Sequence, residues 1–457
     1  MSGEIGRLLV ANRGEIAVRV IRACRDLGIS PVAVYSDADS EALHVQLADE
    51  AVHIGPAHAR KSYLLPEAIV AAALEAGAQA IHPGYGFLSE DPRLPRACEE
   101  AGLVFVGPPA EVMAAVGDKV LAREAAIAAG VAVVPGSEGR LASVTDAQGV
   151  AAELGFPVLL KASAGGGGRG IRPVESAEEL ADAYQRASAE AEAAFGDGGL
   201  FLEKLLVRPR HVEVQVLADA HGNVVHLGER DCSTQRRKQK LIEEAPAPNL
   251  DPAVRDELCE GAVRFARGVG YVGAGTCEFL VDAEGRACFI EMNARIQVEH
   301  GITELVTGVD LVAEQLRIAA GRPLGLSQGE IEPRGAAIEF RINAEDPGNG
   351  FMPSPGEITA WRPASGPGVR VDSGVEAGGV VQPFYDSMVA KLMVWGASRE
   401  EAMDRARRAL EECRIEGVTT TLALHRELLD WEPLRAGEVT IESLEEHLDA
   451  AAALAGA

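Results

Sequence analysis

Short apolar runs alternate with helical stretches through the first hundred residues of the chain. This alternation is typical of a doubly wound α/β domain built on a parallel sheet. The dinucleotide-binding fingerprint Gly-x-Gly-x-x-Gly is absent after the first strand, where the chain reads Ala11-Asn12-Arg13-Gly14-Glu15, so a dinucleotide-binding domain is disfavoured. The pattern predicts strands at 8–10, 32–35, 80–81 and 104–106, and helices at 14–27 and 66–76.

Beyond residue 116 the elements no longer alternate regularly, as expected for α+β architecture. Pro and Gly residues between 322 and 335 mark a boundary, and the alanine-rich tail from Ala450 is expected to fray. The pattern predicts strands at 156–161, 211–217, 224–228, 337–343 and 388–395, and helices at 309–320 and 399–412.

Residues 276–293 read as two alternating strands around the turn-like segment 282–286. If the turn centres between residues 284 and 285, Glu278 faces Glu291 and Thr276 faces Asn293. Opposed carboxylates lie ~5 Å apart and repel unless a cation lies between them, and all-oxygen ligands suit Mg²⁺ or Mn²⁺. A solvated acidic hairpin is the alternative. Apolar neighbours place the hairpin against a core and favour the metal site: Cys277, Phe279, Phe289, Ile290 and Met292.

Three polar residues follow this hairpin at every second position: Arg295, Gln297 and Glu299. An extended chain would project all three to one side, whereas a helix would separate them. A cation, an amide and a carboxylate aimed together could hold a small anion and supply a base. A surface strand would show the same pattern.

Composition narrows the class of protein. The 457 residues suffice for two to four domains, and 47% apolar with 25% charged residues is typical of a soluble globular protein. The net charge of −26 disfavours binding to nucleic acid or to an anionic membrane surface. Seven cysteines without a Cys-x-x-Cys pair indicate neither disulfides nor zinc. No signal segment or membrane span is evident, so a cytoplasmic protein is expected.

Two segments have the chemistry of phosphate binding. A glycine run at 163–170 follows a strand that ends at Lys161, and its backbone N–H groups could close over phosphate oxygens. We favour such a phosphate lid over a mobile linker, because linkers do not usually follow a buried strand. Residues 230–240 hold five cations, enough to neutralise a triphosphate. The alternatives for this second segment are a solvated loop and a nucleic-acid-binding patch, and the net negative charge weakens the latter.

Two strand residues are ambiguous from pattern alone. His211 shares a face with Glu213 and Gln215, so it faces polar surroundings, although a surface histidine would fit as well. Arg341 projects opposite the apolar face of its strand, where a structural salt bridge is the default interpretation.

The sequences of these motifs and their order along the chain closely resemble those of biotin carboxylase, a member of the ATP-grasp ligases. The resemblance implies an N-terminal α/β domain at 1–115, an ATP-grasp domain at 116–330 with a lid at about 133–205, and a C-terminal biotin carboxylase domain at 331–447. The matching strings are ANRGEI (11–16), HPGYGFLSE (82–90), GDK (117–119), the segments 161–170 and 229–240, EEAPAP (243–248), the segment 291–300, RINAEDP (341–347) and YDSMVAK (385–391).

The resemblance also implies a reaction and a division of roles. MgATP, bicarbonate and biotin would give carboxybiotin, ADP and phosphate. Glu278 and Glu291, helped by Asn293, would hold Mg²⁺ or Mn²⁺. The residues implied in ATP binding are Lys119, Lys161, Gly166, Gly167, Gly168, Glu203, Lys204, Leu206, His211, Gln235 and Lys238.

The remaining implied roles concern bicarbonate and biotin. Glu299 would act as the base on bicarbonate, giving carboxyphosphate. Arg341 would stabilise the biotin enolate, and Tyr85 would also contact biotin. The residues implied to hold bicarbonate are Lys240, Arg295, Gln297 and the backbone of Val298, and the implied catalytic set is Glu299, Arg295, Arg341 and Lys240.

Three positions depart from the family pattern. Lys238 stands where His is frequent, and Ala294 stands where Thr is usual. Gly301 follows His300 where Pro is usual, which is expected to loosen the segment after the proposed base. These departures put rate and nucleotide preference in doubt rather than reaction type.

The resemblance extends to partners. The chain has no Met-Lys-Met biotin-attachment string, so separate chains are expected for a biotin carboxyl carrier protein and a carboxyltransferase subunit, with a homodimer of this one. The leading hypothesis is the biotin carboxylase subunit of an acetyl-CoA or acyl-CoA carboxylase, in fatty acid biosynthesis. The alternatives are the same subunit of a split pyruvate or 2-oxoacid carboxylase, another ATP-grasp carboxylate–amine ligase, and a non-catalytic nucleotide-binding scaffold.

Overall fold

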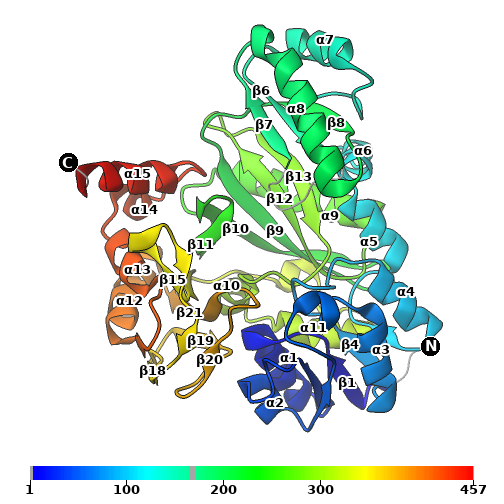
Figure 1. Ribbon diagram of the computed structural model, residues 1–457, viewed down its shortest axis with the longest axis vertical. Helices are drawn as coiled ribbons and strands as arrows, with labels where there is room; N and C mark the ends of the chain where they lie inside the picture. Colours follow the sequence, from blue (N-terminus) through cyan, green and yellow to red (C-terminus); the bar gives the residue numbers. More distant parts are fainter. Residues whose placement is uncertain (1–3, 164–169, 456–457) are drawn as a thin grey trace.

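A computed structural model describes residues 4–163 and 170–455 (Figure 1). The N-terminal part is a five-stranded parallel sheet in the order β3-β2-β1-β4-β5, with helices on both faces. The predicted doubly wound α/β domain is therefore confirmed, although β3 was not predicted. Its elements are β1 (Arg7–Val10), α1 (Gly14–Asp26), β2 (Ser30–Tyr35), α2 (Leu43–Leu47), β3 (Glu50–His53), α3 (Pro66–Glu75), β4 (Ala80–His82), α4 (Arg93–Glu100) and β5 (Val104–Phe105).

A smaller antiparallel sheet forms the upper end of the molecule in Figure 1. It has the order β7-β6-β8, and two helices close an apolar core of its own. Two further helices connect it to the N-terminal sheet. The elements are α5 (Ala110–Gly117), α6 (Lys119–Ala128), α7 (Val144–Leu154), β6 (Val158–Ala162), β7 (Ile171–Val174), α8 (Ala177–Phe195) and β8 (Leu200–Lys204).

The centre of the molecule is one eight-stranded sheet in the order β13-β12-β9-β10-β11-β14-β21-β19. It joins strands from both sides of residue 330, because β11 pairs with β14 through Ile242 and Phe340. The predicted break at 322–335 therefore does not interrupt the sheet. Its strands are β9 (Arg210–Ala218), β10 (Val224–Arg236), β11 (Gln239–Ala245), β12 (Gly273–Val281), β13 (Ala287–Asn293), β14 (Ala336–Asn343), β19 (Val369–Ser373) and β21 (Met388–Gly396).

Helices cover this sheet, and the short strands of the C-terminal part pair into three separate two-stranded sheets, β15-β16, β17-β20 and β18-β22. The helix predicted at 309–320 is α11, the unpredicted α10 precedes it, and the tail from Ala450 continues α15 rather than fraying. The helices are α9 (Pro252–Gly268), α10 (His300–Thr307), α11 (Leu311–Ala319), α12 (Arg399–Glu412), α13 (Leu422–Leu428), α14 (Glu432–Ala436) and α15 (Ser443–Ala455). The short strands are β15 (Glu345–Asp346), β16 (Met352–Pro353), β17 (Gly356–Glu357), β18 (Ala360–Arg362), β20 (Val380–Val381) and β22 (Arg414–Glu416).

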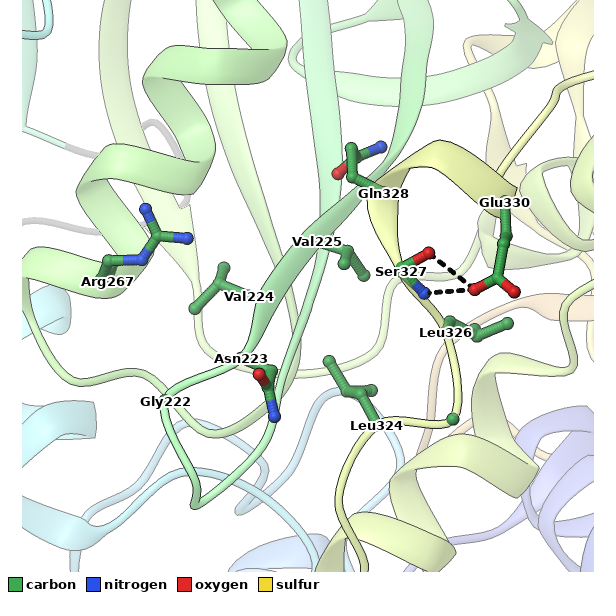
Figure 2. A pocket seen from close by; sticks show the side chains of 11 residues that line it. Gly222, Asn223, Val224, Val225, Arg267, Leu324, Leu326, Ser327, Gln328 and Glu330 are labelled. Carbon is green, nitrogen blue, oxygen red and sulfur yellow. Dashed lines mark hydrogen bonds between the residues drawn. The ribbon is translucent and has the colours of Figure 1, made fainter.

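A surface hollow of about 560 Å³ lies beside the turn between β9 and β10 (Figure 2). Several of its polar groups bond to one another: the Ser327 amide and hydroxyl donate to Glu330, and Gln328 bonds to the backbone of His226. The described residues that line it include none of the predicted site residues. No helix in the described ranges is long and apolar enough to cross a membrane.

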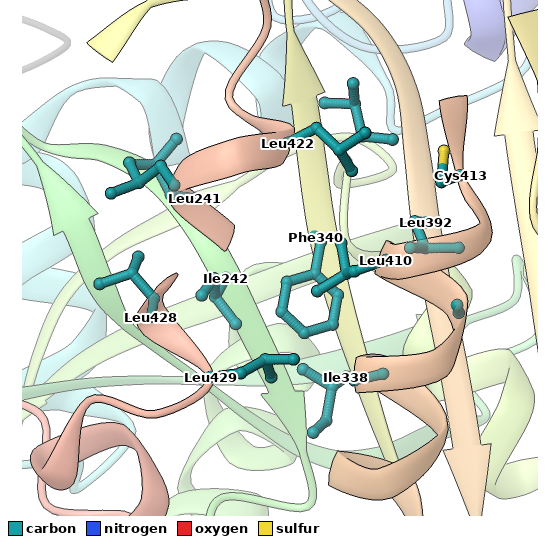
Figure 3. Packing of buried hydrophobic residues seen from close by; sticks show 14 of the residues in the cluster. Leu241, Ile242, Ile338, Phe340, Leu392, Leu410, Cys413, Leu422, Leu428 and Leu429 are labelled. Carbon is teal, nitrogen blue, oxygen red and sulfur yellow. The ribbon is translucent and has the colours of Figure 1, made fainter. Parts of the chain in front are cut away.

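The two faces of the C-terminal half of the central sheet differ in chemistry. On one face Ile338, Phe340 and Leu392 pack against Leu410 of α12 and Leu428 of α13 (Figure 3). Strand residues alternate between faces, so the charged residues at the intervening positions point to the other side. The apolar core therefore determines which side chains point to the opposite face of the sheet, where α10 packs against β14 and β21.

Candidate functional site

The β12–β13 hairpin has the predicted register in the part that carries the two carboxylates. Thr276 pairs with Asn293 and Glu278 pairs with Glu291, as predicted. A bulge follows, so that Phe279 pairs with Phe289 and every pair nearer the turn is displaced by one residue. The predicted turn centre was therefore wrong by half a residue, while the opposition of the two carboxylates is confirmed.

Cationic and polar groups compensate the negative charge of Glu278. His211 Nε2 lies 3.1 Å and Lys240 Nζ 3.2 Å from its carboxylate oxygens, and Asn293 Nδ2 donates at 2.8 Å. Burial opposes ionisation, but Lys240 and His211 lower the pKa of Glu278 well below its usual value. Glu278 is therefore ionised.

Glu291 has a more open environment. Its side chain is 42% exposed, and its Oε2 lies 3.9 Å from Lys119 Nζ. Burial and the neighbouring Glu278 charge raise the pKa of Glu291. Two opposed carboxylates, one of them accessible, form the all-oxygen donor set that Mg²⁺ or Mn²⁺ prefers, so the residues fit the predicted metal.

Lys240 is the hub of the buried charges. Its Nζ donates to Glu213 at 2.6 Å and to Glu299 at 2.7 Å, in addition to its contact with Glu278. Glu213 is fully buried and also pairs with Arg230 at 2.6 Å. Neither Glu213 nor Arg230 was among the predicted site residues. Their only sequence signal was that Glu213 shares a face with His211 and that Arg230 belongs to the basic segment.

The segment 295–299 is a bend and a turn, so the predicted extended chain is wrong. Arg295 and Gln297 nevertheless converge, because Arg295 Nη1 donates to Gln297 Oε1 at 2.8 Å. Arg295 also bonds to Asn293 Oδ1 at 2.9 Å and to Glu90 at 2.9 Å. Glu299 is the N-cap residue of α10. The turn brings Arg295 and Gln297 together by a route that strand alternation did not predict. Gln297 Nε2 also donates to Glu278 at 3.3 Å, and Lys240 contacts both Glu278 and Glu299.

Glu299 is enclosed by cations. It is fully buried, with Lys240 at 2.7 Å from one oxygen and Arg341 Nη2 at 3.0 Å from the other. Burial opposes ionisation, but Lys240 and Arg341 hold the pKa of Glu299 well below its usual value. The carboxylate is therefore in the deprotonated form that a base requires.

Arg341 bridges two buried carboxylates. Its Nε donates to Glu243 at 2.6 Å while its Nη2 reaches Glu299. Burial raises the pKa of Glu243 to about 7, against the opposing effect of Arg341. The default interpretation of a salt bridge holds for Arg341, and one of its partners is the proposed base.

The residues predicted to bind ATP come from several parts of the structure. Lys161 pairs with Glu203 between β6 and β8, and Gln235 Nε2 lies 3.4 Å from His211 Nδ1. Lys204 instead donates to the Gly155 carbonyl at 3.0 Å, so its side chain is turned away from this group. Leu206 follows β8, and Lys238 occupies the turn between β10 and β11 with φ of 64°. Gly166, Gly167 and Gly168 lie outside the described residues.

Tyr85 lies beyond the end of β4 and donates its hydroxyl to Glu15 in the first turn of α1. Burial and the neighbouring Glu15 raise the pKa of Tyr85 well above its usual value. Tyr85 therefore stays protonated and donates its hydroxyl proton to Glu15.

The structure accounts for two of the three departures. The Ala294 amide donates to Glu90 at 3.2 Å, a backbone contact that needs no particular side chain. A Cβ atom at Gly301 would lie 2.3 Å from Met393 Sδ. Met393 thus fills the space that a larger residue at 301 would need, and α10 is packed at this point rather than loosened.

Three stretches of the chain match known protein families. Residues 4–113 match the biotin carboxylase N-terminal domain, residues 118–327 the carbamoyl-phosphate synthase L chain ATP-binding domain, and residues 339–446 the biotin carboxylase C-terminal domain. Together they account for nearly all of the chain.

Individual relatives match over the same length. Biotin carboxylase 1 of Bacillus subtilis is 53% identical over 442 residues, covering 96% of this chain and 98% of the relative. A pyruvate carboxylase subunit of Methanothermobacter thermautotrophicus is 51% identical, covering 96% and 90%. A solved dimer of the biotin carboxylase domain of Hydrogenobacter thermophilus 2-oxoglutarate carboxylase, in complex with MgADP, ADP and bicarbonate, has a TM-score of 0.93 at 51% identity, covering 97% and 98%. The similarity thus extends along the chain in both sequence and fold.

Proposed function

The chain belongs to the biotin carboxylase family, and on this premise we propose that it is an ATP-dependent ligase that carboxylates biotin with bicarbonate. The observation that carries the proposal is a connected set of side chains: Lys240 and Arg341 contact the buried Glu299, Lys240 and Gln297 contact Glu278, and Arg295 contacts Gln297. Glu278 in turn lies opposite Glu291. This arrangement combines cations for small anions, a base, and oxygen ligands for a metal.

The proposed nucleotide site uses the hairpin, the β6–β8 sheet and the residues between them. Glu278 and Glu291, with Asn293, hold Mg²⁺ or Mn²⁺, which neutralises phosphate charge when bound. Lys119 and Lys161 supply positive charge for the phosphates. Further ATP contacts are assigned to Gly166, Gly167, Gly168, Glu203, Lys204, Leu206, His211, Gln235 and Lys238, with Lys204 contributing its backbone because its side chain bonds to Gly155.

The proposed chemistry begins with bicarbonate. Lys240, Arg295, Gln297 and the Val298 amide hold the anion, and Glu299 accepts its proton. A bicarbonate oxygen then attacks the γ-phosphorus, the bond to ADP breaks, and carboxyphosphate forms. Glu299 becomes more basic as Lys240 and Arg341 turn from it toward the substrate anions, because those cations keep it a weak base in their absence.

Biotin enters the second half of the reaction. Carboxyphosphate breaks into CO₂ and phosphate, and the phosphate takes the proton from the biotin ureido nitrogen. The nitrogen attacks CO₂, so that a C–N bond forms. Arg341 stabilises the negative oxygen of the biotin enolate, and Tyr85 contacts the biotin ring system.

The wider assignments extend the same proposal. Three domains at 1–115, 116–330 and 331–447, the middle one with a lid at about 133–205, act with a separate biotin carboxyl carrier protein and carboxyltransferase subunit. A cytoplasmic homodimer in an acetyl-CoA or acyl-CoA carboxylase is our first choice. The split pyruvate or 2-oxoacid carboxylase is the second. One relative, 51% identical, is named a pyruvate carboxylase subunit, and another, 47% identical, a propionyl-CoA carboxylase chain.

Phosphate release from MgATP tests the proposal. Release should require bicarbonate, rise with free biotin, and collapse in Glu299→Gln. Turnover that ignores biotin but responds to amines would move the chain to another ATP-grasp ligase. No turnover under any of these conditions would favour the nucleotide-binding scaffold.

A further inference from the structure

A fully buried lysine lies where three parts of the chain meet. Lys391 on β21 is 0% exposed, and its Nζ donates to the Val298 carbonyl at 2.5 Å. The same Nζ lies 3.5 Å from Glu15 Oε1 on α1. A buried ammonium group is costly unless it is paired, and these contacts, with the nearby carboxylates of Glu339 and Asp372, compensate its charge.

The position of Lys391 in the sheet is specific. It is directly opposite Arg341 across β14 and β21, so both side chains lie on the same face. Arg341 reaches the Glu299 carboxylate, and Lys391 reaches the carbonyl of the preceding residue, Val298. One cross-strand pair therefore holds two successive residues of the turn that carries the proposed base.

The contact between Lys391 and Glu15 leads on to Tyr85, the residue assigned to biotin. Glu15 Oε1, which faces Lys391, also accepts the hydroxyl proton of Tyr85. The backbone at Gly374 packs closely against this turn of α1, because a Cβ there would lie 2.5 Å from the Glu15 amide nitrogen. The backbone of Glu15 is therefore closely packed at this point.

We propose that Lys391 is a positioning residue that couples the two substrate sites through the contacts Tyr85–Glu15–Lys391–Val298, named here the Lys391 bridge. The inference rests on the proposed function, which assigns Tyr85 to biotin and the Val298 amide to bicarbonate. The Val298 carbonyl belongs to the peptide that joins Val298 to Glu299, so Lys391 fixes the link between the residue whose N–H is assigned to bicarbonate and the proposed base. Through Glu15, the same ammonium group fixes the Tyr85 hydroxyl.

The test compares Lys391→Met, Glu15→Gln and the double variant with Lys61→Met, an exposed lysine in the same chain. Loss of a charge-assisted hydrogen bond should raise the KM for bicarbonate about tenfold in Lys391→Met, with the KM for MgATP changed less than about twofold. Glu15→Gln should raise the KM for biotin and, in part, that for bicarbonate. The double variant should have a KM for bicarbonate no higher than that of Lys391→Met, because both changes act through one ammonium group. The KM values of Lys61→Met should match those of wild type.

Equal effects on the KM values for MgATP and bicarbonate, or effects that multiply in the double variant, would overturn the Lys391 bridge. If Lys391→Met does not fold, Glu15→Gln decides alone, since an unchanged KM for bicarbonate contradicts the coupling. A wild-type protein without bicarbonate-dependent phosphate release would overturn the proposed function itself. An active wild type with unaffected variants would overturn only the bridge.

Discussion

At the scale of single residues, the site is a set of buried charges that compensate one another. Lys240 faces three carboxylates, and Arg341 faces two. Removing one member of such a set leaves a buried charge without its partner, which costs about 3–5 kcal/mol. A substitution that preserves the charge therefore reports on catalysis directly, whereas one that removes it, such as Glu299→Gln, needs a parallel measurement of folding.

Arg341→Lys is such a substitution. The lysine keeps a cation near Glu243 and Glu299 but loses the fork that would hold the biotin enolate. We expect biotin carboxylation to fall about 10²-fold, while bicarbonate-dependent ATP hydrolysis stays within about threefold. The control is Arg399→Lys, since Arg399 pairs with buried Glu244 outside the site. Equal loss of both activities in Arg341→Lys would contradict the assigned role.

Gly301 allows a second test at this scale. Gly301→Ala should lower the free energy of unfolding by about 1–3 kcal/mol, because the new Cβ overlaps buried Met393. Adding Met393→Val should restore most of the loss, as urea unfolding would measure. Gly329→Ala is the control, since nothing lies within 4 Å of its Cβ position. Equal effects at 301 and 329 would show that Met393 does not require glycine.

At the scale of elements, the β12–β13 hairpin presents the carboxylates. Removing divalent metal with a chelator should abolish ATP cleavage, and Mg²⁺ or Mn²⁺ should restore it. Glu291→Gln should raise the metal concentration for half-maximal activity about tenfold or more, because one of two charged ligands becomes a neutral amide. Glu284→Gln, at the exposed turn of the same hairpin, should leave it unchanged. An unaltered metal requirement in Glu291→Gln would exclude that residue as a ligand.

How far the sequence predicts an element depends on whether the determining contacts are local. The alternating pattern of side chains in the hairpin correctly predicted that Glu278 lies opposite Glu291. It could not predict the bulge that follows Glu278. The turn at 295–299 was missed because the groups that hold it, such as Glu90 and Lys391, are distant in sequence. Glu213 was missed for the same reason.

At the scale of the whole molecule, the eight-stranded sheet unites the site. Lys240 on β11, Arg341 on β14 and Lys391 on β21 lie on three successive strands. The sequence predicted most of the individual strands, and the family resemblance is confirmed by the comparisons. Strand order across residue 330 could not be predicted, because it depends on pairing between segments about a hundred residues apart.

Buried neutral histidines should make the whole molecule sensitive to acid. Burial lowers the pKa values of His44, His82 and His425 to about 4. Between pH 6.5 and 4 the unfolded chain binds protons that these native histidines do not, so stability must fall as pH falls. Each contributes roughly 1.4 kcal/mol per pH unit within that window.

His82→Asn isolates one of these contributions. The Gly84 amide donates to His82 Nδ1 at 3.0 Å, and an asparagine oxygen can accept the same bond without titrating. Urea unfolding at several pH values should give a slope smaller by about 1.4 kcal/mol per pH unit in this variant. Parallel pH profiles for variant and wild type would contradict the assignment.

In the proposed mechanism, bicarbonate is the nucleophile that attacks ATP in the site around Glu299. The direct measurement is a single turnover with ¹⁸O-labelled bicarbonate, quenched before exchange with water, and mass analysis of the phosphate and of the biotin. The mechanism predicts one bicarbonate oxygen in the phosphate and the other two in the carboxyl group on biotin. Phosphate whose new oxygen comes only from water would contradict it.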